Sequence, residues 1–141
     1  MSVRMVEREE LAAALAQETN ADLVSLLKKL QLTVVERSAT NLRLIHEELA
    51  DLDLLGDILD ASLRSADPDL ALNLLERCME VADPQQFRSV IRTHLRRDQL
   101  LKVLGGSPFL AGLFCREGDC FSRLFLEEKI DTSSVEGQRL R

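Results

Sequence analysis

Leucine dominates the apolar positions of this chain, and over its first half these positions recur with the three-to-four-residue spacing of amphipathic helices. The clearest example is 52–63, where the period is carried by Leu52, Leu55, Leu59 and Leu63. A glycine inside this stretch weakens the prediction, because a mid-helix glycine costs about 1 kcal/mol relative to alanine. The same spacing predicts further helices over 7–17, from an N-cap at Asn20 onward, and over 33–49.

Each of the three prolines follows a residue that can cap a helix. The pairs Asp67-Pro68, Asp83-Pro84 and Ser107-Pro108 therefore predict three helix starts, since proline at the first helical position forfeits no hydrogen bond. We expect Asp98 to cap a further short helix over 99–104. The helix that starts after Asp83 is predicted to bury one continuous face, formed by Phe87, Val90, Ile91, His94 and Leu95.

The stretch 100–125 holds four of the five phenylalanines and four of the six glycines. Gly105 and Gly106 predict a helix end, because glycine accepts the left-handed backbone found at helix C-termini. Gly118 and Asp119 repeat this pattern of a stop followed by a cap. Two short helices with bulky faces are expected here, and the earlier helices must cover Phe109, Leu110, Leu113, Phe114, Phe121, Leu124 and Phe125.

These elements predict an all-α fold, a compact array of about seven or eight short antiparallel helices. The chain has 141 residues, which is enough for one domain with a substantial core. The apolar period is lost after Lys129. We therefore expect a helical domain over 1–131, and a tail or the start of a linker over 132–141.

Composition and charge narrow the possible functions. Apolar residues make up 45% of the chain and charged residues 30%, which is typical of a globular protein. The formal net charge of −6 disfavours binding to nucleic acid or to an anionic membrane surface, because phosphate contacts need basic residues. No apolar run approaches the roughly 20 residues of a membrane span. The three cysteines lack metal-ligand spacing, so we expect reduced thiols and a cytoplasmic location.

Two strings in the second half resemble the glutamine synthetase adenylyltransferases. The first is Ala66-Asp67-Pro68-Asp69-Leu70-Ala71-Leu72-Asn73-x-Leu75-Glu76-Arg77. The second is Leu101-x-Val103-Leu104-Gly105-x-Ser107-x-Phe109-Leu110-Ala111-x-Leu113. In that family such segments lie in the helical region ahead of the first nucleotidyltransferase domain, and the resemblance covers 66–126.

The resemblance implies a non-catalytic helical N-terminal region. The parent enzyme of that family uses ATP and Mg²⁺ to transfer AMP to glutamine synthetase. The family's catalytic signature, a glycine-rich turn followed by Asp-x-Asp on a strand, is not found in this chain. The expected partner is accordingly a protein, either the chain's own catalytic domain or glutamine synthetase, and no cofactor is expected in the chain itself.

Several residues are candidates for catalysis or metal binding. Gly106-Ser107 lies about as far before Asp119 as a nucleotidyltransferase Gly-Ser turn lies before its metal-binding acids, but Phe121 occupies the second acidic position. The pairs Asp51/Asp53 and Asp67/Asp69 are predicted to be helix caps and first-turn acids. His94 is expected to be a hydrogen-bonded core or boundary residue, and His46 has no partner at metal-ligand spacing. Cys78 and Cys115 are expected to act as small apolar residues, with Cys120 near a helix start.

One surface feature is a candidate site. Arg88, Arg92 and Arg96 form an i, i+4, i+8 stripe on the predicted helix, and Arg97 adjoins them. One interpretation is a solvated face whose last turn complements the helix dipole. The other is a docking stripe for an acidic partner surface. The second interpretation leads to an alternative function that needs no family resemblance, a free-standing helical protein-interaction module.

Overall fold

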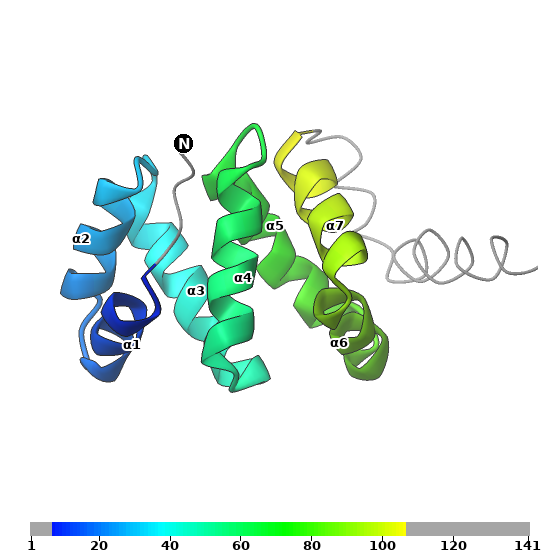
Figure 1. Ribbon diagram of the computed structural model, residues 1–141, viewed down its shortest axis with the longest axis horizontal. Helices are drawn as coiled ribbons and strands as arrows, with labels where there is room; N and C mark the ends of the chain where they lie inside the picture. Colours follow the sequence, from blue (N-terminus) through cyan, green and yellow to red (C-terminus); the bar gives the residue numbers. More distant parts are fainter. Residues whose placement is uncertain (1–6, 107–141) are drawn as a thin grey trace, which may run out of the picture.

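The computed structural model describes residues 7–106, and every regular element in that part of the chain is an α-helix (Figure 1). The helices are α1 (Arg8–Ala16), α2 (Ala21–Lys29), α3 (Val35–Leu49), α4 (Leu52–Leu63), α5 (Pro68–Val81), α6 (Pro84–Arg92) and α7 (His94–Gly106). The all-α prediction is therefore confirmed, with seven helices in the described residues. The helices predicted after Ser107, and the tail predicted over 132–141, lie outside them.

Aspartates start three of these helices. The side chains of Asp51, Asp67 and Asp83 accept hydrogen bonds from the backbone N–H three residues on, at 3.0, 3.1 and 3.1 Å. Pro68 and Pro84 then occupy the first positions of α5 and α6, as their sequence predicted. Such a cap contributes about 0.5–2 kcal/mol to helix stability.

Asn20 behaves differently from its prediction. It precedes α2, but its side chain makes no capping hydrogen bond. Instead its Oδ1 accepts a hydrogen bond from Arg43 Nε at 2.7 Å, so the side chain links α2 to α3.

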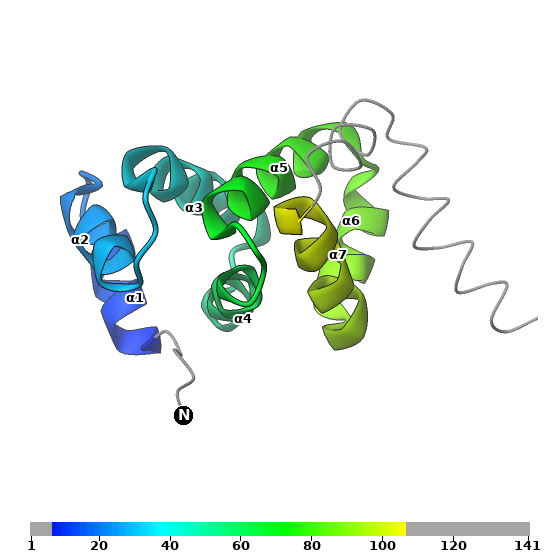
Figure 2. The ribbon, with the colours of Figure 1, turned by 90° about the horizontal axis from the view of Figure 1, so that it is seen from above.

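The helices are arranged in two layers. Figure 2 shows α3 and α5 side by side in one layer, with α4 and α7 in a second layer beneath them. Helices α1 and α2 close one end of the array, and α6 and α7 form the other. In Figure 1, α3 and α5 run down the view while α4 and α7 run up it, which gives the antiparallel arrangement predicted for the chain. The most extensive helix contact is between α5 and α7.

Leucine fills most of the space between the layers. Burying a leucine side chain contributes about 1.5–3 kcal/mol, so the core depends on many similar contributions. The bulkiest side chain that is fully buried in the described residues is Phe87. The other large, fully buried side chains are Leu11, Leu23, Leu27, Leu42, Ile45, Leu55, Ile58, Leu59, Leu72 and Leu75.

Near the C-terminal ends of three helices, a backbone carbonyl accepts a hydrogen bond from an arginine on another helix. A helix leaves its last carbonyls without intrahelical donors, and a cation there also complements the helix dipole. The bonds run from Arg43 Nη1 to Leu15 O in α1 (3.2 Å), from Arg88 Nη2 to Glu48 O in α3 (3.1 Å) and from Arg97 Nη1 to Ile91 O in α6 (3.0 Å). These bonds link α1 to α3, α3 to α6 and α6 to α7, without glycine at the helix ends.

Gly56 and Gly105 both provide room for a neighbour. A Cβ on Gly56 would lie 2.3 Å from the guanidinium carbon of Arg8, which also pairs with Asp57 at 2.7 Å and thereby joins α1 to α4. Gly105 was predicted to end its helix in a left-handed conformation, and this is wrong, because no glycine among the described residues has a positive φ. Gly105 lies within α7 and is buried against the turn between α4 and α5.

We expect Gly105→Ala to lower the free energy of unfolding by about 1–3 kcal/mol, the usual cost of overpacking a tight contact. The added Cβ would lie 2.4 Å from Ser65 Oγ and 3.0 Å from the backbone oxygen of Asp67. The matched control is Gly106→Ala, because a Cβ there meets nothing within 4 Å. Urea denaturation of both variants measures the difference. Equal stabilities would contradict the close packing of α7 on this turn.

The predicted continuous face from Phe87 to Leu95 does not exist. Helix α6 ends at Arg92, and Thr93 is extended (φ −88°, ψ 118°) before α7 begins. The Thr93 hydroxyl donates to Ser89 O at 2.9 Å, which lets the threonine satisfy a carbonyl at the helix end. Phe87 is therefore buried, while Leu95 lies on a different helix with 71% of its surface exposed.

Candidate functional site

The four arginines predicted as one stripe are divided by the break at Thr93. Arg88 and Arg92 belong to α6, and Arg96 and Arg97 belong to α7. The i, i+4, i+8 geometry of a single helix is thus absent. Arg88 and Arg97 are among those that already have intramolecular roles. Arg88 pairs with the Glu48 carboxylate at 2.9 Å, and Arg97 is buried, with 6% of its surface exposed.

Arg97 is the C-terminal cap of α6. Its Nη1 donates to Ile91 O at 3.0 Å, and its Nη2 lies 3.1 Å from His94 Nδ1. A buried guanidinium with these partners holds the α6–α7 corner together and is not available to another molecule. Sequence reasoning missed this role, since it depends on the chain turning back at Thr93.

A smaller exposed surface remains at this corner, and we call it the corner surface. It consists of Arg92, His94 and Leu95, with the half-buried Arg96 at its edge. Arg92 is exposed and makes no ion pair within residues 7–106. Leu95 is the most exposed large apolar side chain in the described residues. An exposed apolar side chain flanked by cations is a combination suited to binding an acidic, amphipathic segment.

Asp98 and His94 link the corner to the rest of the array. Asp98 was predicted to cap a helix, but it lies inside α7. Its carboxylate accepts a hydrogen bond from Arg64 at the end of α4 (3.0 Å) and lies 3.6 Å from His94 Nε2. His94 is hydrogen-bonded to Arg97, as predicted. Its side chain is 69% exposed, however, so it lies at the surface and not in the core or at its boundary.

Asp69 has a larger role than its position in a first turn suggested. It is buried, and its carboxylate accepts hydrogen bonds from Thr33 N (2.7 Å), Thr33 Oγ1 (2.9 Å) and Ser38 Oγ (2.6 Å). Burial by itself raises the pKa of Asp69, but the hydrogen bonds from Ser38 and Thr33 outweigh it and hold the pKa below its usual value. Helix α3 has no side-chain N-cap hydrogen bond of its own, and Asp69 of α5 adds its negative charge to that of Glu36 in the first turn of α3.

Two carboxylates on α5 lie one helical turn apart. Burial raises the pKa of Glu76, and the hydrogen bond and negative charge of Glu80 add to this shift. Glu80 is exposed and Glu76 only partly buried. The pair therefore lies on an open helix surface, which lacks the enclosed cleft of a general acid–base site.

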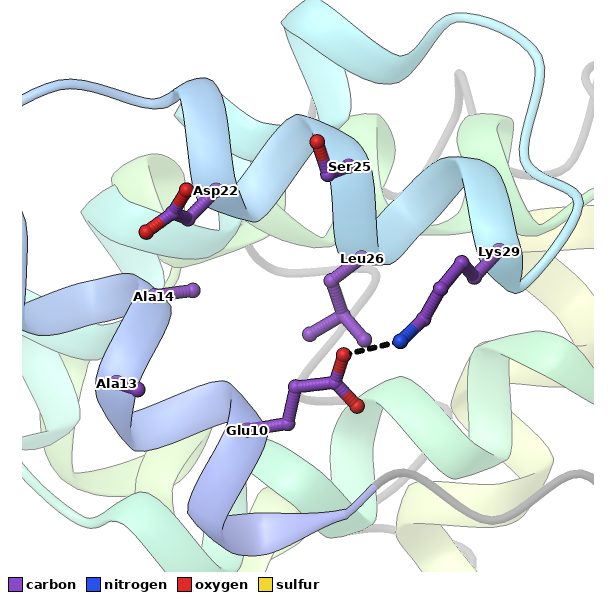
Figure 3. Close-up of a pocket in the computed structure, with 7 residues that line it drawn as sticks. All are labelled: Glu10, Ala13, Ala14, Asp22, Ser25, Leu26 and Lys29. Atoms are coloured by element: carbon purple, nitrogen blue, oxygen red, sulfur yellow. Dashed lines mark hydrogen bonds and ion pairs between the residues drawn. The ribbon is translucent and has the colours of Figure 1, made fainter.

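The part of the chain that the structure describes includes two depressions, and neither has catalytic character. The first lies between α1 and α2, has a volume of about 200 Å³ and is shown in Figure 3. Glu10 and Lys29 form an ion pair across it, and Ala14 and Leu26 also line it. The volume is below the roughly 300–1,000 Å³ of small-molecule sites.

The second depression, about 400 Å³, lies where α3 and α5 begin, around Arg37 and Asn73. The two acidic residues that line it already have hydrogen-bond partners. Asp67 caps α5, and Asp69 is saturated by Thr33 and Ser38. The acids needed to hold a metal beside a phosphate are therefore committed to the fold.

The described residues contain no group of three or more His, Cys, Asp or Glu side chains placed to hold a metal ion. Cys78 is a buried free thiol, as expected for a small apolar residue. Ser107, Cys115, Asp119 and Cys120 lie outside the described residues.

Comparisons with known proteins identify no family. No protein-family model, no curated protein and no solved structure matches this chain. Within residues 7–106, none of the helices has the length and apolar character that crossing a bilayer requires.

Proposed function

We propose that this chain is a non-catalytic helical region that supports AMP transfer to glutamine synthetase by a nucleotidyltransferase domain outside it. The proposal rests on the resemblance of two strings to the glutamine synthetase adenylyltransferases. In this proposal ATP and Mg²⁺ bind to that other domain, the partner is that domain or glutamine synthetase, and the protein is cytoplasmic.

One structural observation supports the proposal. The first resembling string forms the start of α5, and the described part of the second forms the end of α7. These two helices make the most extensive contact in the array, and Gly105 of the second string packs against Ser65 and Asp67. Two strings about 30 residues apart in sequence thus meet in one structural joint. The contact gives both strings the same structural role, which is to hold α5 and α7 together.

The committed roles of the acids support the non-catalytic part. Nucleotidyl transfer depends on metal ions and phosphate contacts held in position. Asp51, Asp67 and Asp69 each accept hydrogen bonds from backbone or hydroxyl donors, which gives these acids a role in the fold itself. This chain's contribution is then to position a partner and not to perform chemistry.

We expect no AMP transfer when the purified chain is incubated with labelled ATP, Mg²⁺ and glutamine synthetase. Adding the nucleotidyltransferase part of a glutamine synthetase adenylyltransferase should give transfer that is several-fold faster with the chain than without it. The readout is label on the synthetase, with a no-protein control. Label from the chain alone would contradict the non-catalytic role, and equal rates with and without the chain would contradict the supporting role.

A second candidate function, a free-standing helical interaction module, is favoured by the corner surface. Its exposed Leu95 and Arg92 are not used by the described fold. A module of this kind needs no downstream domain, so it is the interpretation that remains if the chain has no effect on AMP transfer.

A further inference from the structure

The end of the array that carries the corner surface differs in charge from the rest. Residues 84–106 hold one acidic residue, Asp98, against five basic residues: Arg88, Arg92, Arg96, Arg97 and Lys102. Residues 7–83 hold 17 acidic residues against 7 basic ones. The basic residues all lie on α6 and α7, which together form one end of the molecule in Figures 1 and 2. The described array, which is mainly acidic, therefore has one basic end.

One arginine at this end already pairs with a carboxylate inside the fold. Arg88 on α6 donates to the Glu48 carboxylate at 2.9 Å, although both side chains are more than 40% exposed. Arg92 follows one helical turn later, is exposed, and has no ion-pair partner within the described residues. The guanidinium is suited to a carboxylate because its donors match the spacing of the two oxygens.

Leu95 lies three residues after Arg92, across the extended Thr93, so the two are within about 11 Å along the chain. Nothing in the described fold requires an exposed leucine here, since its 71% exposure means that it adds little to the core. A leucine beside an arginine provides an apolar anchor with a charged rim, which is a common design of protein interfaces.

We propose that the corner surface binds an acidic amphipathic segment of a partner protein, with carboxylates facing Arg92 and an apolar side chain covering Leu95. A nucleic acid fits less well. The acidic remainder of the chain repels a polyanion, and a phosphate backbone offers no apolar group to cover the exposed leucine. This inference is independent of AMP transfer and holds for any partner with such a segment.

The test uses the full chain and a fluorescein-labelled helical peptide in which leucine lines one face and glutamate the other. Fluorescence anisotropy at low salt should show saturable binding that weakens as salt rises, because the contacts are exposed ion pairs. The double variant Arg92→Glu/Leu95→Ser should bind on the order of tenfold more weakly. Binding of a peptide with lysine in place of glutamate should not be weakened by Arg92→Glu/Leu95→Ser, because its cations are attracted to the acidic remainder of the chain and not to the corner surface.

The matched control is Arg37→Glu/Leu44→Ser on α3. It changes an exposed arginine and a leucine that is 40% exposed, and should alter the peptide Kd less than twofold on the scale of scattered surface changes. Circular dichroism checks that both double variants fold. Absence of saturable peptide binding, or equal weakening by the two double variants, would overturn the proposal. Tighter binding of a DNA duplex at the same residues would overturn it in favour of nucleic acid.

Discussion

Phe87→Ala is expected to lower the free energy of unfolding by about 3–5 kcal/mol, the range for deleting a buried phenylalanine. Phe87 is 1% exposed and belongs to α6, which packs against both α5 and α7. Removing the ring leaves a cavity at the contact of three helices, which backbone relaxation fills only in part. Urea denaturation followed by circular dichroism measures the loss.

Leu95→Ala is the control for this experiment, because the hydrophobic pattern assigns both residues to one buried face. The structure puts them on different helices, so Leu95→Ala should change stability by less than about 0.5 kcal/mol. A large loss for Leu95→Ala would show that α6 continues through Thr93 and that the corner surface does not exist. A small loss for Phe87→Ala would show that α6 does not pack on the core.

The second large effect is expected at Asp69. Asp69→Ala removes the acceptor for Thr33 N, Thr33 Oγ1 and Ser38 Oγ, and it leaves the buried Ser38 hydroxyl without this partner. Hydrogen bonds to a charged group contribute about 1.5–3 kcal/mol each and are not additive, so we expect a loss of about 2–4 kcal/mol at pH 7. The variant should mainly weaken the contact of α3 with α5.

This contribution should depend on pH in one direction. The pKa of Asp69 is lower in the folded protein than in the unfolded chain, where it is about 3.9. Acid therefore favours the unfolded state, and the contribution is present above pH 3.9 and is lost as pH falls through the folded-state pKa. Asp69→Asn cannot titrate, so its stability difference from the parent should be largest near neutral pH and shrink on acidification.

Asp67→Asn is the matched control, two residues earlier. Asn caps a helix about as well as Asp, so the change should cost less than about 0.5 kcal/mol at neutral pH. The measurement is a series of urea denaturations from neutral pH to about pH 2.5. A loss for Asp69→Asn that is the same at every pH would rule out its ionised carboxylate as the origin.

Local sequence determined where several helices begin and what class of fold results. The caps at Asp51, Asp67 and Asp83 were predictable because each carboxylate binds a backbone N–H only three residues away. The leucine period over 52–63 predicted α4 with its observed bounds for the same reason. A bond or a period within a few residues depends little on the rest of the chain.

The tertiary structure alone decided what the long-range polar side chains do. Asp69 meets Thr33 from 36 residues away, and Arg88 meets Glu48 from 40 residues away. The break at Thr93 is stabilised by a threonine hydroxyl and by Arg97, which the helical period of Phe87 to Leu95 concealed. The spacing of the arginines could not predict which of them pair within the fold. A guanidinium forms an internal hydrogen bond only if the packing of other helices brings a carbonyl or a carboxylate beside it.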